Sequence, residues 1–342
     1  MSWTGYRDNV LMSDRLQQMH AWIRDQLRLH DYTVLPASED ASFRRYFRLR
    51  ENGRSFIIMD APPGQEDCHP FVNISQRLHA AGLNVPVVYA SDLQSGFLLL
   101  SDLGNTLYLD VLDKNNVHTL YADALSALHM IQQRTTTDGL PDYDEILLMQ
   151  EMHLFSDWLL TAHLGLNLDS DLYAAIEQTF RFLRDKALEQ PQCFVHRDYH
   201  SRNLMVCEDL NPGIIDFQDA VIGPVTYDLV SLLRDCYIKW PKQDTDEWIR
   251  HFFTLAGPEG TDLNTFIQWF DLMGVQRQLK ASGIFARLYH RDHKAGFLKD
   301  IPRTLSYILD LEDNYPQLQV LIDLIRREVM PVLEEKNRLC GQ

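Results

Sequence analysis

The stretch from Phe194 to Phe217 constrains the fold of this chain more than any other part of the sequence. It contains three short apolar runs, and the polar segment His196–Asn203 lies between the first two. This alternation predicts short strands joined by tight loops, with polar side chains held where the strands end. Because strand ends are rigid, they position functional groups well. We therefore expect this stretch to carry the chemistry of the chain.

Three side chains of this stretch, Asp198, Asn203 and Asp216, offer oxygen atoms. Together with His196 they form the pattern HxDxxxxN, followed by an aspartate at the end of an apolar run. Oxygen ligands suit Mg²⁺, and a carboxylate beside the metal can accept a proton. The alternative is a polar turn that is capped by its own side chains. The sequence contains no GxxxxGK[ST], GxGxxG, GxSxG or HExxH motif, so other common catalytic arrangements have no support.

Composition limits the partners of the chain. Its 342 residues carry a formal net charge of −16, which argues against a binder of nucleic acid or of an anionic membrane. No apolar run approaches the ~20 residues of a membrane span, and the first residues lack the pattern of a signal peptide. The five cysteines are scattered and form no CxxC pair, as expected for a protein of the reducing cytoplasm.

Strand patterns dominate the first hundred residues and helical patterns dominate the rest. The change occurs at Ser101–Gly104. This predicts an α+β fold with a small β-rich N-terminal lobe, residues 1–103, and a larger, mostly helical lobe, residues 104–342. The expected strands are 32–36, 46–50, 54–59, 85–89 and 96–100, and the expected helices are 14–29, 70–81, 119–131, 148–163, 172–188, 228–237 and most of 248 onward, with loops at 241–246 and 257–264.

With these features the chain resembles the aminoglycoside phosphotransferase-like family, small-molecule relatives of the protein kinases. The likeness extends to Leu125-x-x-Leu128-His129, Gly223-Pro224 and Tyr227-Asp228-Leu229. It implies a two-lobed, protein-kinase-like fold with ATP and Mg²⁺ as cofactors. Phosphoryl transfer depends on positioning and on charge neutralisation. The resemblance implies that Asp198 is the catalytic base and that Asn203 and Asp216 bind the metal.

The resemblance also implies roles for residues around the base. It makes His196 and Asp228 structural braces of the loop, and His129 reads as a hydrogen-bonded core histidine. His200 lies two residues after Asp198, where protein kinases carry a lysine near the transferred phosphate. We expect His200 to take a related catalytic role, together with Arg202, and simple packing is the alternative.

The expected nucleotide site departs from the family pattern. The loop 37–43 contains no glycine, and the third strand lacks the lysine that would meet the ATP phosphates. The missing lysine supports an alternative function as a nucleotide-binding pseudokinase with a regulatory role, although the intact catalytic residues count against it. The residues that we expect at the nucleotide are Ser38 and Ser42 in the loop, Arg44 and Arg48 as replacement cations, and Asp102, Leu103 and Gly104 as the hinge at adenine.

A basic stretch near the end of the chain suggests the acceptor. Residues 277–303 contain seven Lys or Arg and two acids, a balance of +5 in an acidic protein. The alternative is an ordinary charged helix face. A basic wall favours an acceptor with a carboxylate and disfavours polycationic aminoglycosides. The residues that we expect at the substrate are Arg202, Asp219, Arg277, Lys280 and Arg287.

Several blocks resemble one subgroup of the family more than the others. This subgroup comprises bacterial kinases of cell-wall (peptidoglycan) recycling, which phosphorylate the anomeric hydroxyl of N-acetylmuramate and N-acetylglucosamine. It implies an amino-sugar substrate and a link to a sugar-1-phosphate nucleotidyltransferase. A kinase of choline, homoserine, fructosamine or an aminoglycoside is the alternative. The blocks are Ser38–Arg48, Met59–Pro63 (at the missing lysine), Asp216–Ala220 and Gly283–Leu288.

Overall fold

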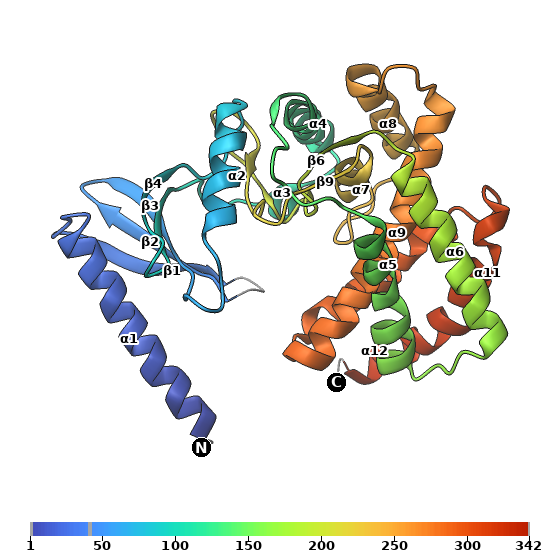
Figure 1. The fold of residues 1–342 in the computed structure, drawn as a ribbon, viewed down its shortest axis with the longest axis horizontal. Helices are drawn as coiled ribbons and strands as arrows, with labels where there is room; N and C mark the ends of the chain where they lie inside the picture. Colours follow the sequence, from blue (N-terminus) through green and yellow to red (C-terminus); the bar gives the residue numbers. More distant parts are fainter. Residues whose placement is uncertain (1–2, 40–42, 341–342) are drawn as a thin grey trace. The chain divides into compact units, whose positions relative to one another are not determined.

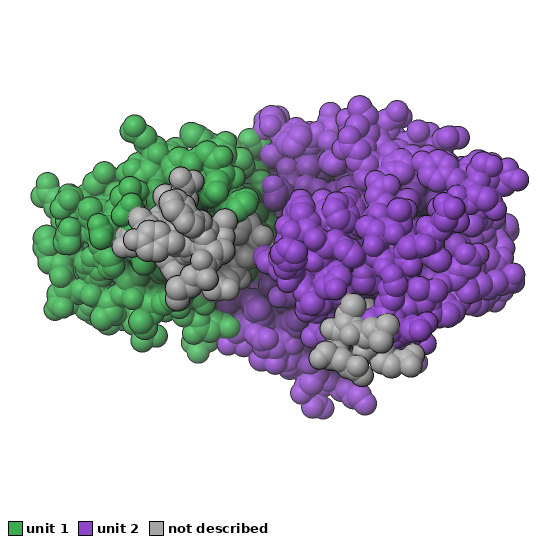
Figure 2. Space-filling model, turned by 90° about the horizontal axis from the view of Figure 1, so that it is seen from below, with its two compact units in different colours: residues 1–105, 207–218 green, residues 106–206, 219–342 purple. Residues whose placement is uncertain are grey.

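A computed structural model describes residues 3–39 and 43–340, and it divides the chain into two compact units (Figure 1, Figure 2). Unit 1 comprises Met1–Asn105 and Cys207–Gln218, and unit 2 comprises Thr106–Val206 and Asp219–Gln342. The sequence predicted a single boundary near residue 103, whereas the structure also assigns the later segment Cys207–Gln218 to unit 1. Asn84 binds this segment to the rest of unit 1. The side chain of Asn84 donates to the carbonyl of Leu210 (3.0 Å), and the backbone carbonyl of Asn84 accepts from the N–H of Ile214 (2.8 Å).

Unit 1 is built on a five-stranded antiparallel sheet in the order β1-β2-β3-β5-β4. One face of the sheet is covered by the N-terminal helix, whose Met19, Trp22 and Ile23 are buried against strand residues such as Leu49 and Phe97. The elements are α1 (Trp3–Asp25), β1 (Thr33–Glu39), β2 (Arg45–Glu51), β3 (Arg54–Asp60), α2 (His69–Ala80), β4 (Val88–Asp92), β5 (Phe97–Ser101) and β8 (Gly213–Ile214).

Two elements of unit 1 differ from the predicted ranges. The first helix begins at Trp3 rather than at residue 14, and it ends at Asp25, shortly before Arg28 adopts a positive φ of 57°. A left-handed residue ends a helix because the regular hydrogen bonding cannot continue past it. The strand expected at 85–89 pairs only from Val88 onward. Pro86 precedes the paired segment, and proline has no N–H to donate to a sheet.

Unit 2 is mostly helical and is organised around the 30-residue helix α9, which packs against α5, α6, α7, η1 and α10 (Figure 1). A small antiparallel pair, β6 and β9, carries the chain into and out of the polar stretch. The elements are α3 (Tyr108–Val111), α4 (Val117–Arg134), α5 (Glu145–Leu154), η1 (Phe155–Leu164), α6 (Ser170–Leu188), β6 (Gln192–Val195), β7 (Leu204–Met205), β9 (Val221–Pro224), α7 (Tyr227–Leu233), α8 (Lys242–Ala256), α9 (Leu263–Asp292), η2 (Ala295–Asp300), α10 (Ile301–Leu309), η3 (Pro316–Leu318), α11 (Gln319–Leu324), η4 (Ile325–Val329) and α12 (Met330–Cys340).

The small sheet unit and the larger helical unit confirm the predicted α+β class. The loop predicted at 241–246 is wrong, because α8 begins there, at Lys242. Pro241 precedes the helix with φ −55°, a value that suits a helix start, and Trp248, Ile249 and Phe252 give the helix its buried face. The helix predicted at 228–237 ends at Leu233. Among the described residues, no helix is long and apolar enough to cross a membrane.

Helix α9 approaches the junction of α5 and η1 closely at Gly283. A Cβ atom at this position would lie 2.3 Å from the carbonyl carbon of Leu154 and 2.6 Å from the amide nitrogen of Phe155. Both are backbone atoms, which cannot rotate away as a side chain can. Glycine therefore permits the packing of α9, and with it the placing of the polar residues that α9 carries.

We expect Gly283→Ala to lower the free energy of unfolding by roughly 2 kcal/mol, because overpacking a dense interior costs more than the helix propensity of alanine returns. Chemical denaturation followed by circular dichroism measures the change. Gly296→Ala is the matched control, since a Cβ there has no heavy atom within 4 Å. A Gly283→Ala protein as stable as the Gly296→Ala protein would contradict this account of the packing.

Candidate active site

The loop that follows β6 is held by the buried carboxylate of Asp228, at the start of α7. This carboxylate accepts hydrogen bonds from the backbone N–H groups of His196 (2.7 Å) and Arg197 (3.0 Å). Arg197 has a positive φ of 77°, so the backbone turns sharply at that point. Burial raises the pKa of Asp228 to about 6, although the two N–H donors and His196 act in the opposite direction. Asp228 is the residue that the resemblance implies as a brace of this loop.

A second buried acid, Asp235, holds the middle of the same loop. Its Oδ2 accepts from both the N–H (2.9 Å) and the hydroxyl (2.5 Å) of Ser201. The carbonyl of Ser201 accepts in turn from the N–H of Leu109 (3.0 Å), and the hydroxyl of Tyr199 donates to the carbonyl of Ala124 (2.8 Å). Sequence reasoning missed Asp235, because one acid after an apolar helix carries no motif.

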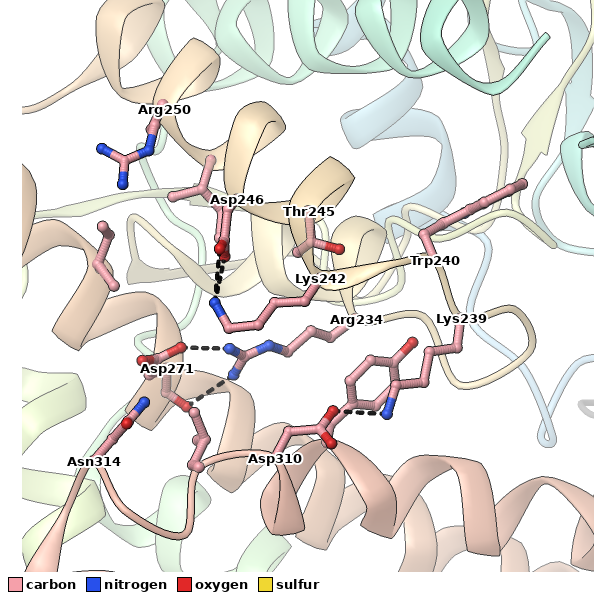
Figure 3. A pocket seen from close by; sticks show the side chains of 14 residues that line it. Arg234, Lys239, Trp240, Lys242, Thr245, Asp246, Arg250, Asp271, Asp310 and Asn314 are labelled. Carbon is pink, nitrogen blue, oxygen red and sulfur yellow. Dashed lines mark hydrogen bonds and ion pairs between the residues drawn. The ribbon is translucent and has the colours of Figure 1, made fainter. Parts of the chain in front are cut away.

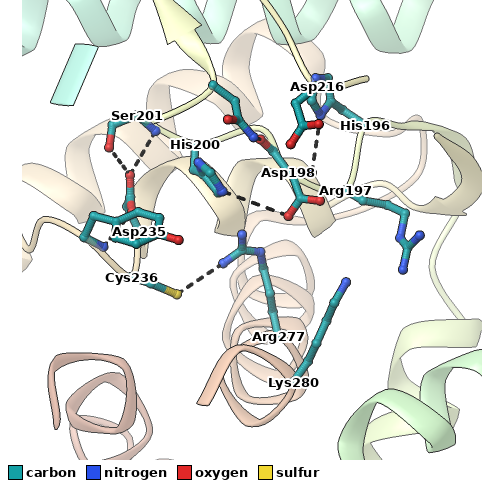
Figure 4. A network of polar contacts seen from close by, with 12 residues as sticks. His196, Arg197, Asp198, His200, Ser201, Asp216, Asp235, Cys236, Arg277 and Lys280 are labelled. Carbon is teal, nitrogen blue, oxygen red and sulfur yellow. Dashed lines mark hydrogen bonds and ion pairs between the residues drawn. The ribbon is translucent and has the colours of Figure 1, made fainter. Parts of the chain in front are cut away.

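Asp198 lies in this braced loop, and its side chain remains 43% exposed (Figure 4). The side chain of Asn203 donates to the carbonyl of Asp198 (3.0 Å). The backbone N–H of Asp198 donates to His196 Nδ1 (3.3 Å). Burial by itself would raise the pKa of Asp198, but the charges of Lys280, Arg277 and Arg197 outweigh it and hold the pKa below its usual value. An ionised, accessible carboxylate can orient a hydroxyl and accept its proton.

His200 contacts Asp198 from one side, with 4.0 Å between His200 Nε2 and a carboxylate oxygen (Figure 4). Burial lowers the pKa of His200 to about 4, although Asp235 and Asp198 act in the opposite direction. Its Nδ1 is buried and has no hydrogen-bond partner among the described residues. His200 is therefore a neutral imidazole near pH 7.

The Nδ1 of His129, on α4, also lacks a hydrogen-bond partner within the described part of the chain, so this atom does not make the core hydrogen bond that was expected of His129.

A buried carboxylate, Glu151 of α5, pairs with two cations near Asp198. Arg197 lies 2.5 Å away and Lys280 of α9 lies 3.0 Å away. Lys280 also donates to the hydroxyl of Tyr227 (2.9 Å), and the hydroxyl of Tyr143 donates to Glu151. Burial raises the pKa of Glu151, but Lys280 and Arg197 more than offset this and lower it overall. Sequence reasoning missed Glu151, which lies 47 residues before Asp198 on a helix with no motif.

The basic stretch does not form one wall with a shared set of contacts. Lys280 is committed to Glu151, and Arg277 is only 4% exposed, with its guanidinium 3.7 Å from Cys236 Sγ. Arg303 pairs with Asp300, and Arg291 pairs with its neighbour in sequence. The remaining candidates are Arg287, which is half-buried with its Nε unpaired among the described residues, and Asp219, whose carbonyl accepts from Arg197 (3.5 Å).

In unit 1, Arg44 is a candidate cation whose charge interacts with that of Asp216. Arg44 is buried and pairs with Glu66 (3.1 Å). Burial lowers the pKa of Arg44, but Tyr46, Glu66 and Asp216 raise it above its usual value overall. Asp216 has φ 65° and accepts from the side chain of Gln218 (2.8 Å).

The other expected nucleotide residues of unit 1 have mixed outcomes. Arg48 binds both carboxylate oxygens of Asp102 (2.6 and 2.9 Å) and the carbonyl of Gly104 (2.9 Å), which commits it to this segment rather than to a phosphate. Burial raises the pKa of Asp102, but bonds from Arg48 and Ser55 lower it overall. The carbonyl of Leu103 accepts from Cys207 Sγ (3.7 Å). Ser42 lies outside the described residues, and of Ser38 only the backbone is described, within β1.

The strand position expected to carry a lysine is occupied by acidic and apolar residues. Asp60, at the end of β3, is buried and pairs with Arg15 of α1 and with Arg45 of β2. Neither arginine is therefore an uncommitted replacement for the lysine. Arg44 differs from these two arginines because its partner is a glutamate, Glu66, as the strand lysine of kinases has.

The donor chemistry fits a magnesium ion that is held mainly by nucleotide phosphates. Among the described residues, no three His, Cys, Asp or Glu side chains cluster as a metal site. Mg²⁺ bound with a nucleotide needs only one or two protein ligands. The amide nitrogen of Asn203 donates to the carbonyl of Asp198, and the side-chain oxygen of Asn203 is the atom of this residue that is chemically able to bind a metal. Asp216 offers a carboxylate.

A separate hollow of about 200 Å³ lies in unit 2, lined mainly by α8, α9 and α10 (Figure 3). Three ion pairs occupy it. Arg234 pairs with Asp271, and the other two pairs are Lys239 with Asp310 (2.7 Å) and Lys242 with Asp246 (2.7 Å). Each carboxylate in it is thus already neutralised. None of the catalytic candidates from the sequence lines this hollow.

Known proteins are similar to this chain over most of its length. Residues 33–264 match the family described as "Phosphotransferase enzyme family". The N-acetylmuramate/N-acetylglucosamine kinase of Pseudomonas putida is 44% identical over 325 residues, which is 91% of this chain and 96% of that protein. The kinase of the same name from Neisseria meningitidis is 36% identical over 89% of this chain and 93% of its own.

A solved structure supports the fold. The GDP complex of an aminoglycoside 2′-phosphotransferase has a TM-score of 0.61 with 17% identity, and the match covers 85% of this chain and 98% of that one. At this identity the likeness concerns the fold alone, and it confirms the predicted kinase-like architecture. Since the family match spans more than half of the sequence and a relative with 44% identity aligns over 91% of it, the chain belongs to the phosphotransferase enzyme family.

Proposed function

We propose that this phosphotransferase transfers the γ-phosphoryl group of ATP to the anomeric (C1) hydroxyl of N-acetylmuramate and N-acetylglucosamine. The observation that carries the substrate is the 44% identity, over 91% of the chain, to a kinase named for these two sugars. The exposed, ionised Asp198 in its braced loop supports the chemistry. We further propose that the enzyme works in the cytoplasm in peptidoglycan recycling and that a nucleotidyltransferase uses its sugar 1-phosphate product.

Asp198 is the proposed base that orients the C1 hydroxyl and accepts its proton. Its lowered pKa keeps it ionised at neutral pH, and the loop contacts to Asp228 and Asp235 fix its position. Asn203 and Asp216 are the proposed magnesium ligands. Bound Mg²⁺ would neutralise the charge on the ATP phosphates. Phosphoryl transfer needs little more than this positioning and neutralisation.

Arg44 is the proposed replacement for the missing strand lysine. In kinases a lysine is held by a glutamate and meets the nucleotide phosphates. The buried Arg44–Glu66 pair has the same charge arrangement. Burial lowers the pKa of Arg44, but Tyr46, Glu66 and, to a smaller extent, Asp216 raise the pKa above its usual value overall. The pair supports a working nucleotide site and counts against the pseudokinase alternative.

The proposal is tested by incubating the protein with Mg-ATP and each sugar. ADP release and a sugar phosphate that is stable in alkali but labile in acid are expected, because a phosphate on the anomeric carbon hydrolyses readily in acid. Choline, homoserine, a fructosamine and an aminoglycoside serve as the comparison panel. Turnover of one of these alcohols with none on either amino sugar would overturn the substrate assignment.

His200 is the neutral imidazole beside Asp198, and its protonation opposes folding. Its folded pKa of about 4 lies below the unfolded value, so the folded state binds fewer protons between about pH 6.5 and pH 4. Its contribution to stability is thus complete above pH 6.5 and is lost as the pH falls through 4.

We expect wild-type protein to lose about 2 kcal/mol more unfolding free energy between pH 7 and pH 5 than His200→Asn does, because the variant lacks this titration. Chemical denaturation at the two pH values gives the difference. His251→Asn is the matched control, since His251 is exposed on α8. If His200→Asn and His251→Asn show the same pH dependence, His200 does not titrate in this way.

A further inference from the structure

Arg202 lies in the loop between Asp198 and Asn203, and its guanidinium packs against two aromatic rings. Its Cζ is 4.7 Å from the ring centroid of Tyr237 and 5.3 Å from that of Phe297. Phe285 of α9 stacks on Phe297 with 5.6 Å between centroids and an angle of 16°. The rings come from the segment after α7, from η2 and from α9, so three separate parts of unit 2 build this cluster.

These contacts orient Arg202 without using its hydrogen-bond donors. A guanidinium packs its flat face on aromatic rings, and its N–H groups then point outward in the plane. Arg202 is exposed, and within the described part of the chain no hydrogen bond or ion pair engages its guanidinium. The cation is pre-oriented and its donors are available to a ligand.

The other cations near Asp198 differ from Arg202 in this respect. Arg197 and Lys280 are neutralised by Glu151. Arg277 is only 4% exposed, so a substrate that enters from solution has little access to its guanidinium. Arg202 is thus the cation of this loop best suited to recognise an anion.

The cluster is also adjacent to the proposed base. The ring of His200 lies 5.4 Å from the ring of Tyr237, and His200 Nε2 lies 4.0 Å from Asp198. Tyr237 therefore contacts both His200, which faces the base, and Arg202. An acceptor whose hydroxyl meets Asp198 can direct a substituent two carbons away toward Arg202. In N-acetylmuramate that substituent is a lactyl ether with a carboxylate, and N-acetylglucosamine lacks it.

We propose that Arg202, held against Tyr237 and Phe297, binds the carboxylate of an acidic sugar and so sets the preference of the enzyme for the acidic over the neutral acceptor. A guanidinium fork binds a carboxylate through two parallel N–H···O bonds. The proposal rests on the proposed function, because it requires a sugar acceptor at Asp198. It assigns to one arginine the recognition of a carboxylate that was expected of the whole basic stretch.

The test compares kcat/KM for N-acetylmuramate with kcat/KM for N-acetylglucosamine, two acceptors that differ only in the lactyl group. Arg202→Gln should lower the acid-to-neutral ratio about 10- to 100-fold, the range expected for hydrogen bonds to a charged group. Arg202→Lys should lower it less, since lysine keeps the charge and loses the fork. Phe297→Leu should lower it in part, because it removes one ring that orients the guanidinium.

Arg181→Gln is the matched control, an exposed arginine of the same unit on α6, and it should leave the ratio at the wild-type value. An Arg202→Gln protein with an unchanged ratio overturns the proposal, including the case in which both sugars lose activity equally because Arg202 contacts a phosphate. A wild-type protein that phosphorylates neither sugar overturns the proposed function itself, and this is seen before any variant is made.

Discussion

The carboxylate of Asp228 is the constraint on which the loop that carries Asp198 depends. It is fully buried, and it accepts from the N–H groups of His196 and Arg197 at a backbone turn with positive φ. Burying a carboxylate is costly unless it is hydrogen-bonded, so the loop and the acid stabilise each other. Asp235 repeats this arrangement five residues further along the loop, at Ser201. Between these two anchors, Asp198 is held while its carboxylate remains accessible.

Charge pairing divides the cations of the site by task. Glu151 pairs with Arg197 and Lys280, and the charges of these two cations help to keep Asp198 ionised. Arg202 is oriented by aromatic rings instead of by an acid, so its charge is retained for recognition. A count of Lys and Arg in the sequence cannot distinguish a paired cation from an unpaired one, because it gives the charge and not the partner of each residue.

The sequence predicted the features that depend on local pattern. The class of fold followed from strand and helix periodicity, and the position of the loop followed from HxDxxxxN between apolar runs. It did not predict the features that depend on distant pairing. Glu151 lies on a helix without a motif, Asp235 follows the end of α7, and Arg48 is bound by Asp102, 54 residues away. The start of α8 was missed because a polar run after Pro241 has the composition of a loop, and its buried face begins only at Trp248.

The central claim is that Asp198 is the base of a phosphoryl transfer, and the single-turnover rate of Asp198→Asn tests it most directly. Asparagine keeps the shape of the side chain and cannot accept the proton, so the transfer rate should fall about 10²- to 10⁴-fold while nucleotide affinity stays at the wild-type value. Asp313→Asn, at an exposed aspartate of unit 2, should transfer at the wild-type rate. An Asp198→Asn protein with a near-normal transfer rate would contradict the account.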